Sequence, residues 1–359
     1  MFKNKIFKYF FIEFIKFFLI ISLSLSFLVW ITQAARLLEL ITEYGNPVHI
    51  YIKFLILSYP KIFNNIFLLS FAISMFFLLN KMQNDKELNI YWMAGISKLK
   101  IIQFSILITS VLLVFYLIFS TFIVPWSSLK GRQILGNSKF SQINSLVKAK
   151  NFNSPLKGLT VYVETNNNKG NLEGIFIYEK ERTIIASRGE VLFDGNKNFL
   201  KLYNGSTQEI VNGSVNTINF KTTIFDFTKF QMQNVSHPKF TEREINWLFK
   251  NINNPEFEKI NRGKEIREEI NSRLIKPFFI IILCITSCFL LYSNNEKINL
   301  AKFKFFIYSY TAFLIILNQT ILEMSGKTLT HSFLYIIFIF ILGVFSFLII
   351  NKTIKSETK

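Results

Sequence analysis

The sequence predicts an α-helical polytopic membrane protein with six spans and an inserted all-β domain. Of the 359 residues, 50% are hydrophobic and 16% aromatic but only 18% are charged, a composition that few soluble proteins share. Six stretches without Asp, Glu, Lys or Arg approach the roughly 20 residues needed to cross a bilayer. A long polar segment with alternating apolar positions separates the third stretch from the fourth. We therefore expect three spans, a β domain and three further spans.

The six predicted spans are Phe17–Ala35, Ile62–Asn80, Ile101–Leu129, Pro277–Asn295, Phe305–Leu322 and Ser332–Asn351. No small-x-small cleavage site follows a short apolar core in the first one, so we interpret it as a retained helix and not as a signal peptide. The predicted domains are 1–129 with spans one to three, 130–272 with the β domain and its connecting helices, and 273–359 with spans four to six and a tail.

Basic residues are distributed unevenly between the two sides of these spans. Fourteen lysines lie on the side of both termini, against four basic residues in the short segments of the other side. The fourteen are Lys3, Lys5, Lys8, Lys16, Lys81, Lys86, Lys98, Lys100, Lys297, Lys302, Lys304, Lys352, Lys355 and Lys359, and the four are Arg36, Lys53, Lys61 and Lys327. Because cytoplasmic loops carry the excess of Lys and Arg, we expect cytoplasmic termini and an extracytoplasmic β domain.

The segment between spans three and four has the pattern of β structure. Leu159, Val161 and Val163 alternate with polar residues, as in a half-buried strand. Turn signals such as Asn204-Gly205 and Asn212-Gly213 accompany the strands. Further strand candidates are Gly174–Glu181, Thr183–Phe193, Asn198–Val211 and Ser214–Phe227. Five or more short strands with such turns predict a sandwich or a jelly-roll-like domain.

Enzyme chemistry finds no support in the residue pattern. The histidines His49, His237 and His331 lack Cys, Asp or His partners at metal-ligand spacing, so we expect no metal site. Gly326-Lys327-Thr328 resembles the end of a P-loop, but Ile321 stands where that motif requires glycine. We therefore expect no catalytic residues and no cofactor in this chain, so any energy for its work must come from a partner or an ion gradient.

The segment 84–97 between spans two and three is too polar to cross a bilayer and too apolar for an ordinary loop. Asp85 and Glu87 stand where carboxylates favour the start of a helix, and Gly95 is placed to end it. The apolar face of this helix comprises Leu88, Tyr91 and Trp92. Two interpretations stay open, an interfacial helix lying on the membrane and a coupling helix inserted into a soluble ATPase.

Arg36, Lys53 and Lys61 lie near the other ends of the first two spans. Lys61 follows Pro60 at the start of span two, where a lysine commonly extends its ammonium group towards the interface. The alternative is that the three residues together bind an anionic group, a phosphate or a carboxylate, near the outer leaflet.

At segment 84–97 the chain resembles the LptF/LptG family of lipopolysaccharide-export permeases. The family pattern, close to D-x-E-L-x-x-x-x-x-x-G-x-S, is matched by Asp85, Glu87, Leu88, Gly95 and Ser97. The resemblance covers nearly the whole chain, through Trp30–Ile41, Val124–Ser128, Lys157–Val163 and Glu269–Pro277. Pro125-Trp126-Ser127 and the Thr32-to-Arg36 segment are more similar to LptF than to its paralogue LptG.

The resemblance implies a permease subunit of an ABC transporter in the bacterial inner membrane. The implied partners are a paralogous LptG-like permease, a cytoplasmic ABC ATPase dimer, a periplasmic jelly-roll bridge protein and lipopolysaccharide, without nucleic acid. Asp85, Glu87, Trp92, Gly95 and Ser97 are the implied ATPase-coupling residues, with Glu87 meeting an arginine of the ATPase. Arg36, with Lys53 and Lys61, is placed to bind lipid A phosphates. Glu323 departs from relatives that carry a basic residue after span five.

Three alternatives stay open at this point. The chain could be the LptG-like paralogue of the same complex. It could belong to another ABC permease family, although those usually carry the extracytoplasmic domain after span one. It could also be a non-transporting membrane scaffold whose β domain binds a partner, although a scaffold does not need a helix like that of segment 84–97.

Overall fold

The computed structural model describes residues 2–38, 48–140, 149–156, 159–167, 171–179, 182–194, 197–211, 214–226, 238–259, 262–292 and 300–357. The chain divides into two compact units. The helical unit comprises Met1–Thr32, Ser58–Leu129 and Pro238–Lys359, and the β unit comprises Gln33–Leu57 and Lys130–His237. The connecting helices after Pro238 therefore belong to the helical unit, although the predicted β domain, 130–272, included them.

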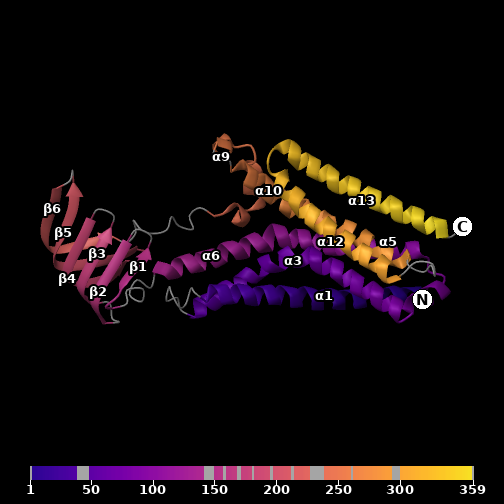
Figure 1. Cartoon of the computed structure of the whole chain (residues 1–359), viewed down its shortest axis with the longest axis horizontal. Helices are drawn as coiled ribbons and strands as arrows, with labels where there is room; N and C mark the ends of the chain where they lie inside the picture. The colour runs from indigo at the N-terminus through magenta and orange to yellow at the C-terminus, as the bar shows by residue number, and fades with distance from the viewer. Residues whose placement is uncertain are drawn as a thin grey trace. The chain divides into compact units, whose positions relative to one another are not determined.

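Among the described residues, six helices or helical runs are long and apolar enough to cross a membrane, as the sequence predicts. Figure 1 labels most of their parts. They are α1 (Phe2–Leu37), α3 (Val48–Asn84), the run of α5 (Lys98–Ile118), η1 (Phe119–Ile123) and α6 (Val124–Phe140), the run of α10 (Gly263–Leu274), η4 (Lys276–Phe278), α11 (Phe279–Cys288) and η5 (Phe289–Tyr292), α12 (Leu300–Ser325), and α13 (Leu329–Glu357). The helices extend beyond the charge-free stretches, and their terminal turns contain lysines and other polar residues.

The centre of the helical unit is α11, which packs against α5, α12 and α13. Every residue of α11 except the half-buried Ile281 is buried, and a helix that is apolar all round belongs in an interior. Its two cysteines, Cys284 and Cys288, are buried free thiols among the core residues. Between α1 and α3, Phe14 packs edge-on against Phe71, and Phe18 packs edge-on against Phe67.

Spans three and four each contain an irregular turn, and the two turns meet. Pro277 in η4 has no amide N–H, so it cannot donate to the Arg273 carbonyl one turn earlier. The Ser120 hydroxyl, carried by the π-helical turn η1, donates to that carbonyl at 3.0 Å and also lies 3.2 Å from the Leu117 carbonyl. The break in span four is thus compensated by a side chain that the π-turn presents.

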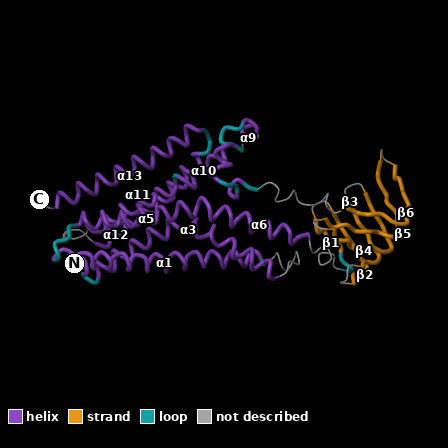
Figure 2. Tube along the Cα trace, turned by 180° about the vertical axis from the view of Figure 1, so that it is seen from behind, coloured by secondary structure: helices purple, strands orange, loops and turns teal. Residues whose placement is uncertain are grey.

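The β unit contains one antiparallel sheet whose strands follow one another in chain order (Figure 2). Its strands are β1 (Phe152–Leu156), β2 (Leu159–Asn167), β3 (Asn171–Glu179), β4 (Arg182–Asp194), β5 (Lys197–Val211) and β6 (Ser214–Asp226). The inserted β domain is therefore confirmed, but its described strands make a six-stranded meander and not the two sheets of a sandwich. Alternating apolar residues predict strands well, whereas they do not say which strands pair.

The apolar positions predicted for β2 do lie in the core of the sheet. Leu159, Val161 and Val163 are buried together with residues of β3, β4, β5 and β6. Asn204-Gly205, in contrast, is not a turn, because both residues lie inside β5. Asn204 has a left-handed backbone with φ of 47°, yet β5 keeps its pairing with β4 and β6 on both sides of it. Gly213 and its neighbour Asn212 lie outside the described residues.

Candidate functional site

The segment predicted as a coupling helix contains α4 (Glu87–Met93), a helix of seven residues. Lys86 enters it with a left-handed backbone, φ of 56°, and Gly95 leaves it with φ of 67°. The Gly95 amide donates to the Trp92 carbonyl at 3.0 Å, and the Ile96 amide donates to the Tyr91 carbonyl at 3.0 Å. These two bonds form a Schellman motif, so Gly95 ends the helix as predicted, although α4 is shorter than 84–97.

The two faces of α4 have different environments. Leu88 and Tyr91 are buried in the core of the helical unit, and Trp92 is half-buried with the Lys98 ammonium 6.0 Å from its ring centre. Ile90 and Met93 point outwards and are 55% and 88% exposed. The helix thus uses one apolar face for packing and leaves a second apolar surface uncovered in this chain.

Glu87 is held by a side chain from the first span. The Tyr9 hydroxyl of α1 donates to Glu87 Oε1 at 3.0 Å. The other carboxylate oxygen, Oε2, is buried and has no hydrogen-bond partner, and the same is true of the Tyr91 hydroxyl one turn further along α4. Burial raises the pKa of Tyr91, and the nearby Glu87 charge raises it further, so this phenol stays neutral.

Two lysines, Lys16 and Lys81, are bound to a different carboxylate. Glu13, one turn after Tyr9 on α1, pairs with Lys81 at 2.7 Å and with Lys16 at 3.0 Å. Asp85 and Ser97, the other polar residues of the predicted coupling site, are exposed at the two ends of the α4 segment. Ser97 precedes α5, and its carbonyl accepts the Lys100 amide at 3.0 Å.

The predicted cationic residues lie on α1 and α3. In the β unit, the Tyr51 hydroxyl donates to the Ala34 carbonyl at 2.6 Å, which joins the end of α1 to the start of α3. Arg36 and Lys53 are two residues from these joined positions and are exposed. Lys61 is exposed on α3 within the helical unit. The structure therefore brings Arg36 and Lys53 to neighbouring helix ends.

A cavity of about 640 Å³ opens between α1, α3 and α12 in the helical unit. Its wall is largely apolar and includes Phe17, Phe76 and Phe77. Polar groups gather at the end of α3, where the Asn80 amide is hydrogen-bonded to the Tyr308 hydroxyl. Such a cavity suits an apolar chain with a polar end.

The family model for lipopolysaccharide export system permease LptF/LptG matches residues 8–352. The chain belongs to this family. A protein of Rickettsia prowazekii (strain Madrid E), described as "Uncharacterized protein RP871", is 22% identical to it over 301 residues. The aligned region covers 81% of this chain and 83% of that protein.

Membership of the LptF/LptG family makes the chain a lipopolysaccharide-export permease. It is a transport subunit of the inner membrane that works in an export complex with other proteins. The matched region contains all six spans and the inserted β domain, so the fold predicted from the resemblance is confirmed.

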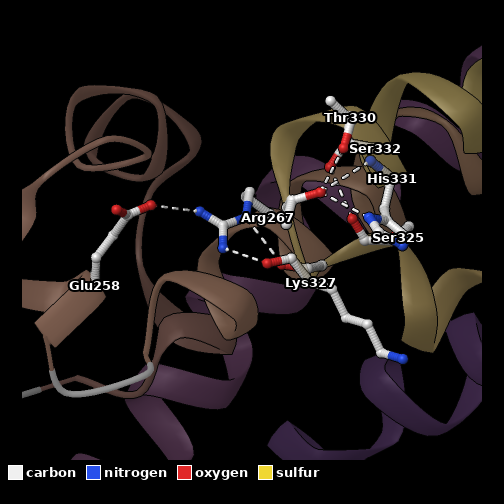
Figure 3. A network of polar contacts seen from close by, with 9 residues as sticks. Glu258, Arg267, Ser325, Lys327, Thr330, His331 and Ser332 are labelled. Carbon is white, nitrogen blue, oxygen red and sulfur yellow. Dashed lines mark hydrogen bonds and ion pairs between the residues drawn. The ribbon is translucent and has the colours of Figure 1, made fainter.

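A cluster of buried polar side chains on α10, here called the polar joint, was not predicted from the sequence (Figure 3). Arg267 is buried and donates to the Gly326 carbonyl at 2.9 Å, to the Lys327 carbonyl at 3.0 Å and to Glu258 at 3.1 Å. One turn later, Asn271 donates to Ser325 and Ser332. The sequence did contain a signal for it, because the four-residue spacing of Arg267 and Asn271 places both on one helical face beside an apolar stripe.

Arg273 continues this joint on the other side of α10. Its guanidinium pairs with Glu269 at 2.6 Å and donates to the carbonyls of Arg243 and Phe240. Phe240 begins η3 (Phe240–Glu242), which precedes α8 (Ile245–Lys250) and α9 (Pro255–Lys259). The permease therefore fixes the start of span four by three buried polar side chains, which bind backbone carbonyls and polar side chains in equal number.

Proposed function

We propose that this permease is the membrane subunit of an ABC transporter that extracts lipopolysaccharide from the inner membrane, and that α4 couples it to a cytoplasmic ATPase. The observation that carries this proposal is the outward face of α4. Ile90 and Met93 are exposed while the opposite face is anchored in the core, with Glu87 at the first turn. A short helix with apolar anchors fits a groove on a soluble partner.

The alternative, an interfacial helix lying on the membrane, is less compatible with the composition of α4. Helices that bind membrane surfaces carry Lys and Arg on their polar face, because the lipid headgroups are anionic. The seven residues of α4 include one carboxylate and no basic residue. A protein groove that offers a cation to Glu87 satisfies both the apolar and the acidic groups.

The proposed orientation places α4 and both termini in the cytoplasm and the β domain in the periplasm, following the distribution of lysines. Arg36, Lys53 and Lys61 then lie towards the outer leaflet, where they bind the phosphates of lipid A. ATP-driven closure of two permeases against each other reduces the space for the lipid and expels it towards the periplasm.

The partner permease in this proposal is an LptG-like paralogue, and this chain takes the LptF place because of the Pro125-Trp126-Ser127 and Thr32-to-Arg36 segments. The β domain passes lipopolysaccharide to a periplasmic bridge protein by strand pairing. The strand that suits this pairing is β6, which has 13 residues, whereas β1 has five and contains Pro155.

The test is a mild-detergent pull-down of the tagged full-length chain, with the bound proteins identified by mass spectrometry. We expect a soluble ABC ATPase and a second six-span permease to be recovered. Met93→Asp places a charge on the outward face of α4, so we expect ATPase recovery to fall at least tenfold, because burying an unpaired carboxylate in a groove is costly.

Met93→Leu is the matched control, since it keeps an apolar side chain at the same exposed position and should retain the ATPase. Neither change disturbs internal packing, because Met93 is 88% exposed. Recovery of the chain alone, or only with proteins that bind its β domain, would favour the scaffold alternative. Equal ATPase recovery by both variants would show that α4 is not the docking helix.

A further inference from the structure

The contact between Tyr9 and Glu87 joins the first span to the proposed coupling helix. Tyr9 lies 78 positions before Glu87 in the sequence, and its hydroxyl is bonded to Oε1 at 3.0 Å. Phe10, Phe14 and Phe18 follow on a buried face of α1, so the helix that carries Tyr9 is fixed against its neighbours. A movement of Glu87 relative to α1 must therefore break this hydrogen bond or displace the first span.

In the described part of the chain, Glu87 forms no ion pair, although the charge of Lys81 is near it. Lys81 and Lys16 both bind Glu13, so the only donor to Glu87 is a neutral phenol. Its Oε2 atom is buried without a donor. A carboxylate accepts up to about four hydrogen bonds, so Glu87 is incompletely satisfied. A guanidinium would offer two parallel charged hydrogen bonds and is the stronger ligand.

We propose that Tyr9 is a positioning residue that holds the coupling carboxylate of Glu87 in an inward resting orientation, from which a cation of the docked ATPase withdraws it. This inference rests on the proposed function and extends it to the first span. Exchange of the phenol for the cation separates α4 from α1, and span one thereby receives the signal that the ATPase has engaged. A lysine at this place would hold Glu87 too firmly for such an exchange, and the pairing of Lys81 with Glu13 keeps that lysine away.

This arrangement predicts an unusual direction for Tyr9→Phe. The variant removes one hydroxyl and leaves the ring, so docking no longer has to break the hydrogen bond to Glu87. We expect the ATPase to bind about fivefold to tenfold more tightly, in line with the net strength of an ordinary protein hydrogen bond. We also expect lipopolysaccharide released per ATP hydrolysed to fall at least threefold, because the first span is no longer linked to Glu87.

The experiment uses the full-length permease complex in lipid nanodiscs for the affinity of the co-purified soluble ATPase, and in proteoliposomes for release of lipopolysaccharide. The variants are Tyr9→Phe, Glu87→Gln and the double variant. Tyr310→Phe is the matched control, since this partly exposed tyrosine of α12 has no hydrogen bond from its hydroxyl among the described residues. In the Glu87→Gln background, Tyr9→Phe should change neither quantity by more than about twofold.

A merely structural role for Tyr9 would weaken ATPase binding and would add to the effect of Glu87→Gln. Either result overturns the inference, and so does a Tyr9→Phe variant that behaves like Tyr310→Phe. If wild-type permease binds no ATPase, the proposed function and the inference fall together. If it binds the ATPase and Glu87→Gln uncouples it while Tyr9→Phe has no effect, only the inference falls.

Discussion

Gly95 and Gly326 each end a helix, and different physical constraints require glycine at the two positions. Gly95 has φ of 67°, and a Cβ atom there would meet nothing within 4 Å, so its constraint is the left-handed backbone. Gly326 stands between α12 and α13, and a Cβ atom there would overlap with the Lys264 carbonyl oxygen of α10. The partial P-loop sequence Gly326-Lys327-Thr328 is thus explained by helix packing.

Gly326→Ala should destabilise the permease by about 3 kcal/mol, because the methyl group separates the turn from α10 and breaks the hydrogen bonds of Arg267. Gly343→Ala in α13 is the control, since its Cβ would lie at an ordinary 3.8 Å from Ile282 of α11. That change should be neutral or stabilising by up to about 1 kcal/mol. Thermal unfolding in detergent gives the comparison, and equal midpoints for the two variants would contradict the packing argument.

The residues of the candidate site were predictable to different degrees. Glu87 and Gly95 were accessible because short-range rules place carboxylates at helix starts and glycine at helix ends. Tyr9 was not, because its hydrogen bond to Glu87 depends on how α1 packs beside α4. The exposure of Ile90 and Met93 was also missed, since the sequence pattern alone did not say which apolar face of α4 would be covered.

At the scale of elements, hydropathy predicts the six spans but not the irregular turns within them. The π-turn η1 has no sequence signal of its own, and its reason becomes visible only when Ser120 is seen beside the Arg273 carbonyl. Pro277 does mark the break in span four, because proline removes a donor from the helix. The ends of β2 to β6 were predicted to within about three residues, whereas β1 was not predicted, and the meander order came from the structure.

Ser120→Ala tests the connection between spans three and four. The change leaves the buried Arg273 carbonyl without the hydroxyl that Pro277 cannot replace, so the expected loss of stability is about 1 to 3 kcal/mol. Amide hydrogen exchange should become faster at residues 274–279, where α10 meets α11. The matched control is Ser110→Ala in the same span, because Ser110 is exposed and bonds only to the Ile106 carbonyl of its own helix. Equal exchange in the two variants would argue against a compensating role for Ser120.

At the scale of the whole molecule, the division into two compact units has an experimental advantage. All four tryptophans, Trp30, Trp92, Trp126 and Trp247, belong to the helical unit. Tryptophan fluorescence therefore reports on the helical unit alone, while amide exchange can follow the strands. Compact units with their own cores commonly unfold as separate cooperative units.

Leu202→Ala should destabilise the β unit by about 2 to 5 kcal/mol, because Leu202 is fully buried in the sheet core. We expect faster amide exchange throughout β2 to β5 and no shift in the unfolding transition followed by tryptophan fluorescence. Leu192→Ala on β4 is the control, since Leu192 is 37% exposed and should cost much less. A fluorescence transition that moves together with amide exchange would mean that the two units unfold as one.

The two outer strands of the sheet are unequal, so its two edges differ in their ability to pair with a further strand. Among the described strands, β1 is a blocked end, because five residues that include Pro155 offer few amide donors. β6 is an open end of 13 residues, with Val215, Ile218 and Ile224 exposed. Copies of this sheet cannot pair in an unlimited row, because each copy has one edge strand that can pair, β6, and one that pairs poorly, β1. In the strand pairing that we propose, this sheet would therefore begin a row of paired sheets and could not lie within one.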